Sequence, residues 1–282
     1  MPRSLPLALL SVCGWLAATA LGADESPPRN EASIDFSAFA GSGLKNSGVG
    51  LGNQSGTTVN LAWFQRESLG RPGLYWSWGL RADVYSFENP GGFALRRLQD
   101  FGATIALEYF VGAEPAAKLS ISPGLFFENH PSSAAWDVPI DLVAGVPVTK
   151  SLDGVFGFSA ARFYHRTVPV VGFVWTVNPQ WRLEAVYPEP SLVWTLSKTL
   201  EARLGGELEG AGFRTDARPV RRTVEYFGYR VGLKVTGRIA SGWKISAAGG
   251  YEVSRQFDFF HEQQKVQASG APFLKLGLEF AR

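Results

Sequence analysis

Few side chains in this 282-residue sequence have the types and the spacing that catalysis requires. His130 and Ser132 lie two residues apart, and a serine becomes a nucleophile when an adjacent histidine takes its proton and a third group orients that histidine. Asn129 is the nearest candidate for the orienting group, and Pro131 would interrupt a strand that held the pair. The pattern favours a solvated loop over a hydrolytic site.

Paired carboxylates form a second candidate. Glu207 and Glu209 would share one face of a strand, where two neighbouring carboxylates can tune a general acid. Arg230 and Lys234, on a following strand, could instead pair with them across the sheet. We therefore predict a charge ladder at this place.

The remaining candidates are weaker. His261, with Asp258 and Glu262, is the one acidic cluster that contains a histidine, as a protease site would, but all three belong to one expected long loop. The single cysteine, Cys13, excludes a CxxC zinc site. We predict no catalytic residue, no metal site and no cofactor.

Composition excludes several classes of protein. The formal net charge is +2 and no basic tail or face stands out, which argues against a nucleic-acid partner. Hydrophobic residues make up 45% of the chain, too many for a disordered protein. Residues 41–56 contain scattered Gly-x-Gly, but a phosphate-binding fingerprint opens a helix, whereas 57–64 resembles a strand. We expect a flexible loop at 41–55.

These groups must be positioned by strands, because the dominant period of the sequence is two. In 74–84, Leu74, Trp76, Trp78 and Leu80 alternate with smaller or polar residues, which places one face in an apolar medium and the other in a polar one. Fourteen strands are predicted, with twelve as the alternative count. They start near residues 32, 56, 73, 98, 117, 136, 153, 168, 180, 190, 199, 222, 242 and 271.

The connections between strands and the positions of the tryptophans indicate that the apolar medium is a lipid membrane. Short turns alternate with mostly longer links, the arrangement of outer-membrane barrels. Trp175, Trp181 and Trp243 lie near strand ends, at the depth where an aromatic girdle meets lipid headgroups. The sequence therefore predicts an all-β fold, a single transmembrane antiparallel β-barrel of about 14 strands, rather than a soluble sandwich.

The N-terminus has the features of an export signal. Arg3 precedes an apolar run, and Ala20 and Gly22 are the small residues of a cleavage site before Ala23. We expect a signal peptide at 1–22, a short periplasmic N-terminal segment at 23–31 and the outer-membrane barrel at 32–282. This division places no plug domain before the first strand.

Residues 171–210 carry a tryptophan-bearing strand after a turn, then the hairpin Pro188-Glu189-Pro190, then Gly205-Gly206-Glu207. In these features the segment resembles a family of bacterial outer-membrane β-barrels of unknown function. The resemblance implies a barrel in a Gram-negative outer membrane and no particular activity. The His130 and Ser132 spacing is also similar to that of outer-membrane phospholipase A, but the Asn-Gly that follows the serine in that family is absent here.

The function expected from these patterns is a narrow, porin-like passive channel or solute-interaction barrel, not an enzyme. A structural closed barrel that displays surface loops is the alternative, and a lipid hydrolase is a minor one. Charged residues predicted to face a polar lumen are Arg81, Asp83, Glu108, Asp141, Arg182, Glu184, Glu201, Arg203, Glu207, Glu209, Arg230, Lys234, Lys244 and Glu252.

Three partners are expected. Outer-membrane lipids would surround the barrel, and lipopolysaccharide phosphates could meet the arginine pairs 96–97 and 221–222, because arginine binds phosphate through two parallel hydrogen bonds. Barrel-assembly machinery would recognise the terminal strand from Leu274 to Phe280, although Ala281 and Arg282 follow the aromatic residue. No nucleic acid is expected.

Overall fold

The computed structural model describes residues 27–88, 95–111, 114–164, 167–216, 223–259 and 263–282. The predicted signal peptide at 1–22 lies outside these residues, as do Arg221, Arg222, His261 and Glu262. No helix among the described residues is long and apolar enough to span a membrane.

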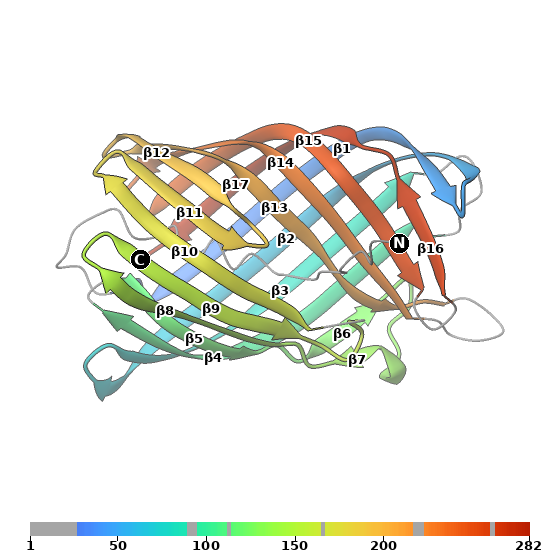
Figure 1. Cartoon of the computed structure of the whole chain (residues 1–282). Coiled ribbons are helices and arrows are strands. Elements are labelled where there is room, and N and C mark those ends of the chain that lie inside the picture. The colour runs from blue at the N-terminus through green and yellow to red at the C-terminus, as the bar shows by residue number, and fades with distance from the viewer. Residues whose placement is uncertain (1–26, 89–94, 112–113, 165–166, 217–222, 260–262) are drawn as a thin grey trace.

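One antiparallel sheet closes on itself to form the whole described fold (Figure 1). Its first half contains β1 (Asn30–Asn46), β2 (Val49–Arg71), β3 (Leu74–Glu88), β4 (Arg97–Val111), β5 (Glu114–Ile121), β6 (Gly124–Phe127), β7 (Trp136–Asp137), β8 (Ile140–Thr149) and β9 (Leu152–Ala160). Its second half contains β10 (Val168–Asn178), β11 (Trp181–Tyr187), β12 (Ser191–Ser197), β13 (Leu200–Arg214), β14 (Thr223–Ala240), β15 (Trp243–Phe259), β16 (Gln264–Ala268) and β17 (Ala271–Ala281).

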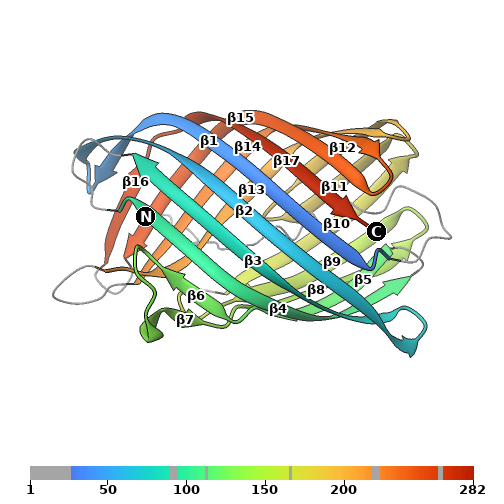
Figure 2. The ribbon, with the colours of Figure 1, turned by 180° about the vertical axis from the view of Figure 1, so that it is seen from behind.

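These segments make a barrel of fourteen strands, because β5 continues into β6, β7 into β8, and β16 into β17. The barrel closes where β1 pairs with both β2 and the last strand, β17, as Figure 2 shows from behind. The predicted all-β barrel of about 14 strands is confirmed. A single 3₁₀ turn at Ser133–Ala135 interrupts the strands between β6 and β7.

The strands alternate as the period of two predicts. Along β3, Ser77, Arg81 and Asp83 are buried, whereas Leu80 between them is exposed. The same alternation occurs along β4, where Phe101 and Ile105 are exposed and Thr104 is buried. In these parts of β3 and β4, polar and charged side chains thus point into the barrel, and large apolar side chains point out of it.

The expected loop at 41–55 is wrong. Residues on both sides of a two-residue turn continue β1 and β2, which pair as far as Asn46 and Val49. Ser47 and Gly48 both have positive φ angles, 48° and 87°, the conformation of a tight hairpin turn that suits glycine. Alternation also persists there, since Leu44 is buried inside the barrel, so the polar residues extend the wall and do not form a loop.

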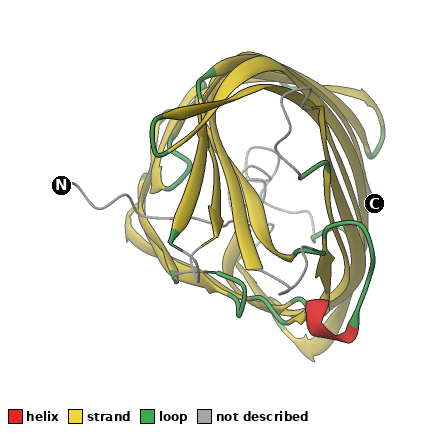
Figure 3. Cartoon of the chain, turned by 90° about the vertical axis from the view of Figure 1, so that its right-hand side faces the viewer, coloured by secondary structure: helices red, strands yellow, loops and turns green. Residues whose placement is uncertain are grey.

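The wall is not of uniform height. β11 and β12 have seven residues each, whereas their neighbour β13 has fifteen. β12 pairs with β13 only up to Ser191 and Gly205. At its C-terminal end, β13 pairs with β6 in one parallel bridge between Arg214 and Phe127. In the view along the barrel, part of the wall runs inside the outline of the cylinder (Figure 3).

Candidate functional site

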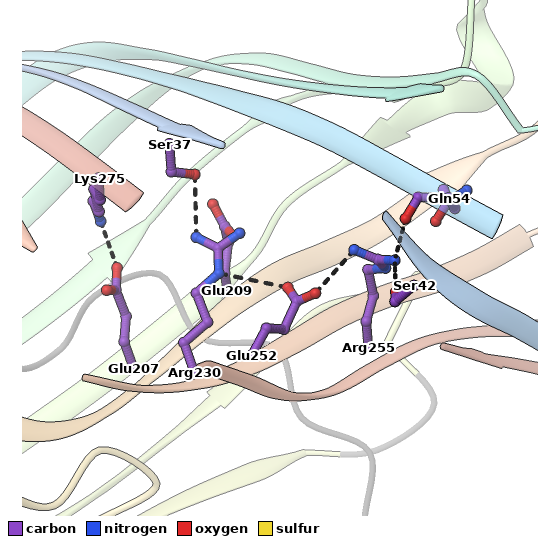
Figure 4. A network of polar contacts seen from close by, with 9 residues as sticks. All are labelled: Ser37, Ser42, Gln54, Glu207, Glu209, Arg230, Glu252, Arg255 and Lys275. Carbon is purple, nitrogen blue, oxygen red and sulfur yellow. Dashed lines mark hydrogen bonds and ion pairs between the residues drawn. The ribbon is translucent and has the colours of Figure 1, made fainter. Parts of the chain in front are cut away.

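A ladder of buried charges lines the interior of the barrel (Figure 4). Arg230 on β14 is fully buried, and its guanidinium contacts Glu209 on β13 at 2.6 Å and Glu252 on β15 at 3.5 Å. It also donates a hydrogen bond to Ser37 on β1 at 3.1 Å. β15 and β17 lie between β14 and β1 in the sheet, so Arg230 reaches over two strands on the inner face of the wall.

Arg255 extends this ladder toward the longer strand ends. Its guanidinium contacts the other oxygen of Glu252 at 2.9 Å, Ser42 at 2.8 Å and the backbone oxygen of Gln54 at 3.1 Å. Lys275 pairs with Glu207 at the opposite end of the group. Three carboxylates therefore face three cations, and the "charge ladder" below means Glu207, Glu209, Arg230, Glu252, Arg255 and Lys275 (Figure 4).

Sequence reasoning placed Arg230 correctly opposite the carboxylates but chose the wrong second cation. Glu207 pairs with Lys275 of β17, and not with Lys234, which lies opposite Arg203 in the β13–β14 register. Lys275 is 68 positions away in the sequence, and the contact reaches over β14 and β15, so it depends on how the sheet curves. No local pattern could have found this pair.

Two further networks line the same interior. Arg66 joins Glu31 and Glu108, and Lys118 contacts the second oxygen of Glu108 at 3.3 Å. Near the short-turn end, Glu184 is fully buried and accepts contacts from Arg182 at 2.9 Å and Arg203 at 2.7 Å. In these two networks the buried Glu108 and Glu184 each have two cations against them, which offset the cost of burying a charge.

A third group adds hydroxyl and amide partners to its charges. Arg81 lies 3.6 Å from Asp100, and Asn60 donates a hydrogen bond to Asp83. Ser159 donates one to Asp141. Of the other residues predicted to face the lumen, Glu201, Lys234 and Lys244 are half-buried toward the short-turn rim.

Aromatic side chains fill the barrel beside the charge ladder. Tyr226 is buried at the centre of this cluster, with ring centroids 5.0 Å from Tyr85, 5.3 Å from Phe87 and 5.2 Å from Phe257. Phe213 packs against Tyr85 from β13. We name these five rings the aromatic plug. All five lie in the halves of their strands that are farther from the short turns.

This filling departs from the water-lined lumen that the alternation suggested. A fourteen-strand barrel has more room than the eight-strand kind that side chains fill completely. Here Phe, Tyr and paired Arg and Glu side chains occupy the space, and Glu108, Glu252 and Arg255 are almost fully buried. Side chains therefore pack the interior from the charge ladder to the aromatic plug, and the half-buried charges lie nearer the short turns.

The three predicted girdle tryptophans lie on the outer surface. Trp175 and Trp243 are exposed, and Trp243 packs against Phe280 with ring centroids 4.9 Å apart. Trp181 stacks face to face on Trp194, with centroids 5.3 Å apart and planes 3° from parallel. All three are close to the short turns of their hairpins.

The candidate nucleophile has no geometry for hydrolysis. The Nδ1 atom of His130 lies 2.9 Å from Asp216, an orienting carboxylate that sequence proximity could not reveal. Ser132, however, begins the short 3₁₀ turn, and no hydrogen bond joins it to His130 among the described residues. Glu128, whose pKa is raised by burial, accepts a hydrogen bond from the backbone of Asp216. The histidine therefore belongs to a contact between β6 and the end of β13.

Comparisons with known proteins identify the architecture. No family model matches this chain, and no curated protein matches it. The COG4313 outer membrane channel from Pseudomonas putida F1 shares 9% identity, with 92% of this chain and 97% of that chain covered and a TM-score of 0.50. The toluene transporter TodX from the same species shares 9% identity, with 90% of each chain covered and a TM-score of 0.39. The KdgM porin shares 10%, with 89% and 99% covered and a TM-score of 0.31.

At such low identity, the likeness to the first of these structures concerns the fold alone. That fold is the closed antiparallel barrel of bacterial outer-membrane channels, in agreement with the barrel class that residues 171–210 resemble.

Proposed function

We propose that this chain is a bacterial outer-membrane channel whose lumen is closed at rest by the aromatic plug and the charge ladder. The observation that carries the proposal is the reversal of the usual arrangement of a protein: large apolar side chains are exposed all around the wall, and charges are buried inside. Hydrocarbon tails are the medium that such an outer surface suits. A constriction made of the aromatic plug and the charge ladder would control the passage of solutes through the barrel.

The two faces differ in what they could contact. Exposed residues on β4, β10 and β17 include Ile105, Phe173 and Leu276. A water-soluble protein seldom exposes a continuous apolar surface of this extent. The inward faces of the same strands bear residues such as Glu108 and Lys275, for which lipid would be unsuitable. An outer-membrane location is therefore part of the proposal.

Conductance through planar bilayers tests the function. Wild-type protein should give small or rare current steps, because the rings around Tyr226 close the interior. Tyr226→Ala combined with Phe87→Ala should give steps that are larger and more frequent, since removing both rings opens the centre of the plug. Each protein is first checked for folding by the faster gel migration of an unheated barrel.

The matched control is Phe101→Ala, which removes an aromatic ring from the exposed outer face of β4. This variant should conduct as the wild type does. Silence of the doubly substituted protein, in a preparation that migrates as a folded barrel, would instead support the competing function, a structural closed barrel. That second candidate is favoured by the dense packing of the interior.

Two partner assignments remain part of the proposal. Arg96 and Arg97 are exposed at the rim opposite the short turns, where lipopolysaccharide phosphates would lie. Replacing both by alanine should reduce the lipopolysaccharide that co-purifies with the barrel. The terminal strand β17, with Leu274 and Leu276 exposed, is proposed as the signal for barrel-assembly machinery, and a β17 peptide should compete with the chain for assembly.

A further inference from the structure

One stretch of the wall breaks the rule that outward side chains are exposed. On β13, Glu207 and Glu209 point inward to the charge ladder, so Leu208 between them points outward. Leu208 is nevertheless only 3% exposed, whereas Leu204, four residues earlier on the same face, is 55% exposed. Something other than lipid must cover Leu208.

The cover comes from the inward face of the neighbouring wall. Leu208 and Phe227 belong to a buried cluster with valines of β8 to β11, namely Val143, Val155, Val168, Val170 and Val186. By their alternation these valines point into the barrel: Val143 is two residues from Asp141, and Val155 is four residues from Ser159, which bonds Asp141 inside the barrel. The outer face of β13–β14 therefore lies beneath the inner face of β8–β11. We name this overlap the apolar seam.

A glycine allows the two walls to come this close. A Cβ atom added to Gly212 of β13 would lie 2.2 Å from the backbone oxygen of Phe163, which follows β9. Gly206 of the same strand has a different role: a Cβ atom there would lie 2.1 Å from the hydroxyl of Tyr229 on the paired strand β14, within one wall. At Gly212 the seam is thus a tight contact, and the side chains of its buried cluster are apolar.

The edge of the seam is the part of β13 that follows its pairing with β12. Beyond Gly205, the edge of β13 has no partner strand until Arg214 among the described residues. Its N–H groups at Gly206 and Leu208 donate instead to the Pro190 backbone oxygen at 2.8 Å and to the Glu189 carboxylate at 3.0 Å. A side-chain acceptor replaces the strand, so this edge can separate without breaking a hydrogen-bonded ladder.

We infer that the apolar seam is a lateral entry site for a small apolar molecule dissolved in the membrane. The inference rests on the proposed function and adds the class of solute. An apolar molecule dissolved in the membrane would lie against the exposed outer faces beside the seam. The valines of the seam continue this apolar surface into the barrel. The charge ladder lies on the opposite face of β13–β14 and offers such a molecule no favourable contact.

Site-specific blocking tests the inference. The protein is prepared with Cys13 replaced by serine and with Leu208→Cys, so that one thiol lies in the seam. Cells producing it are treated with the apolar reagent N-(1-pyrenyl)maleimide, and entry of the apolar dye N-phenyl-1-naphthylamine is followed by fluorescence. Labelling should occur, because the seam opens to the membrane, and should lower dye entry to the rate of cells without the barrel.

Leu204→Cys is the matched control, since it places a thiol on the same strand and face but in contact with the membrane. It should label fully and leave dye entry unchanged. The inference is overturned if Leu208→Cys stays unlabelled while Leu204→Cys reacts. It is equally overturned if fully labelled Leu208→Cys admits the dye at the unlabelled rate.

A second pair of variants examines the edge contact. Glu189→Ala removes the acceptor of the Leu208 N–H group and should raise dye entry about tenfold, the effect expected when a buried donor loses its hydrogen bond. Glu189→Gln keeps an oxygen acceptor and should behave as wild type. Equal dye entry in both variants, in barrels that fold by gel migration, would contradict the role of this contact.

Conductance separates this inference from the proposed function. If the plug variants conduct but seam labelling has no effect on dye entry, the lateral entry site is wrong and the channel stands. If no variant conducts in bilayers, the channel itself is wrong, whatever the dye does.

Discussion

Glu252 joins the two guanidiniums of the charge ladder, because one of its oxygens contacts Arg230 and the other contacts Arg255. Without it, the fully buried guanidiniums of Arg230 and Arg255 would lose the carboxylate that lies between them. We expect Glu252→Ala to lower the free energy of unfolding by about 3–5 kcal/mol, the cost of removing one partner from a buried ion pair. Urea unfolding in lipid vesicles, followed by tryptophan fluorescence, measures it.

Glu88→Ala serves as the control for that measurement. Glu88 is an exposed carboxylate at the end of β3, and its loss should change the free energy of unfolding by less than about 0.5 kcal/mol. Similar losses in both variants would mean that the ladder contributes no more than any surface charge.

At the scale of the element, the close approach of β13 to the neighbouring wall depends on Gly212, which has no side chain. Gly212→Ala would place a methyl group 2.2 Å from the Phe163 backbone oxygen, so the two segments must move apart. We expect a loss of about 1–3 kcal/mol in the free energy of unfolding, as in other overpacked sites. The same urea titration applies.

Gly41→Ala on β1 is the matching control, because no atom lies within 4 Å of a Cβ added there. Its free energy of unfolding should stay within about 0.5 kcal/mol of the wild type. If Gly212→Ala is equally harmless, the two walls do not pack as tightly as the contact between Gly212 and Phe163 requires.

For the whole molecule, the decisive property is which face meets lipid. Ile105 lies near the middle of β4 and is 47% exposed, whereas Val111 lies on the same face at the strand end. Ile105→Arg should lower the free energy of unfolding in vesicles by about 2–4 kcal/mol, because it places a charge at the depth of the hydrocarbon core. Val111→Arg should cost only about 0–1 kcal/mol near the interface.

These two arginine variants also test the membrane location itself. In a water-soluble barrel both arginines would point into solvent, and neither would destabilise the protein. Equal, negligible losses together with recovery of the processed chain without detergent would therefore refute the outer-membrane location.

The sequence by itself determined the elements of this protein and the face that each side chain occupies. Side chains alternate across a strand because of local backbone geometry. The opposite faces of Leu80 and Arg81 can therefore be predicted without any knowledge of the fold. Strand positions and the number of barrel strands follow from the same local signal. The prediction failed at the glycine-rich 41–55 segment, which was expected to be a loop but continues β1 and β2.

Tertiary structure alone decided which residues meet inside the barrel and how the wall closes. Arg230 reaches Ser37, 193 positions away, and Asp216 reaches His130, 86 positions away. Leu208 has the pattern of a lipid-facing residue, yet the inner face of another part of the wall covers it. Such contacts arise from strand register, unequal strand lengths and sheet closure, which are properties of the whole chain and leave no mark on a local period of two.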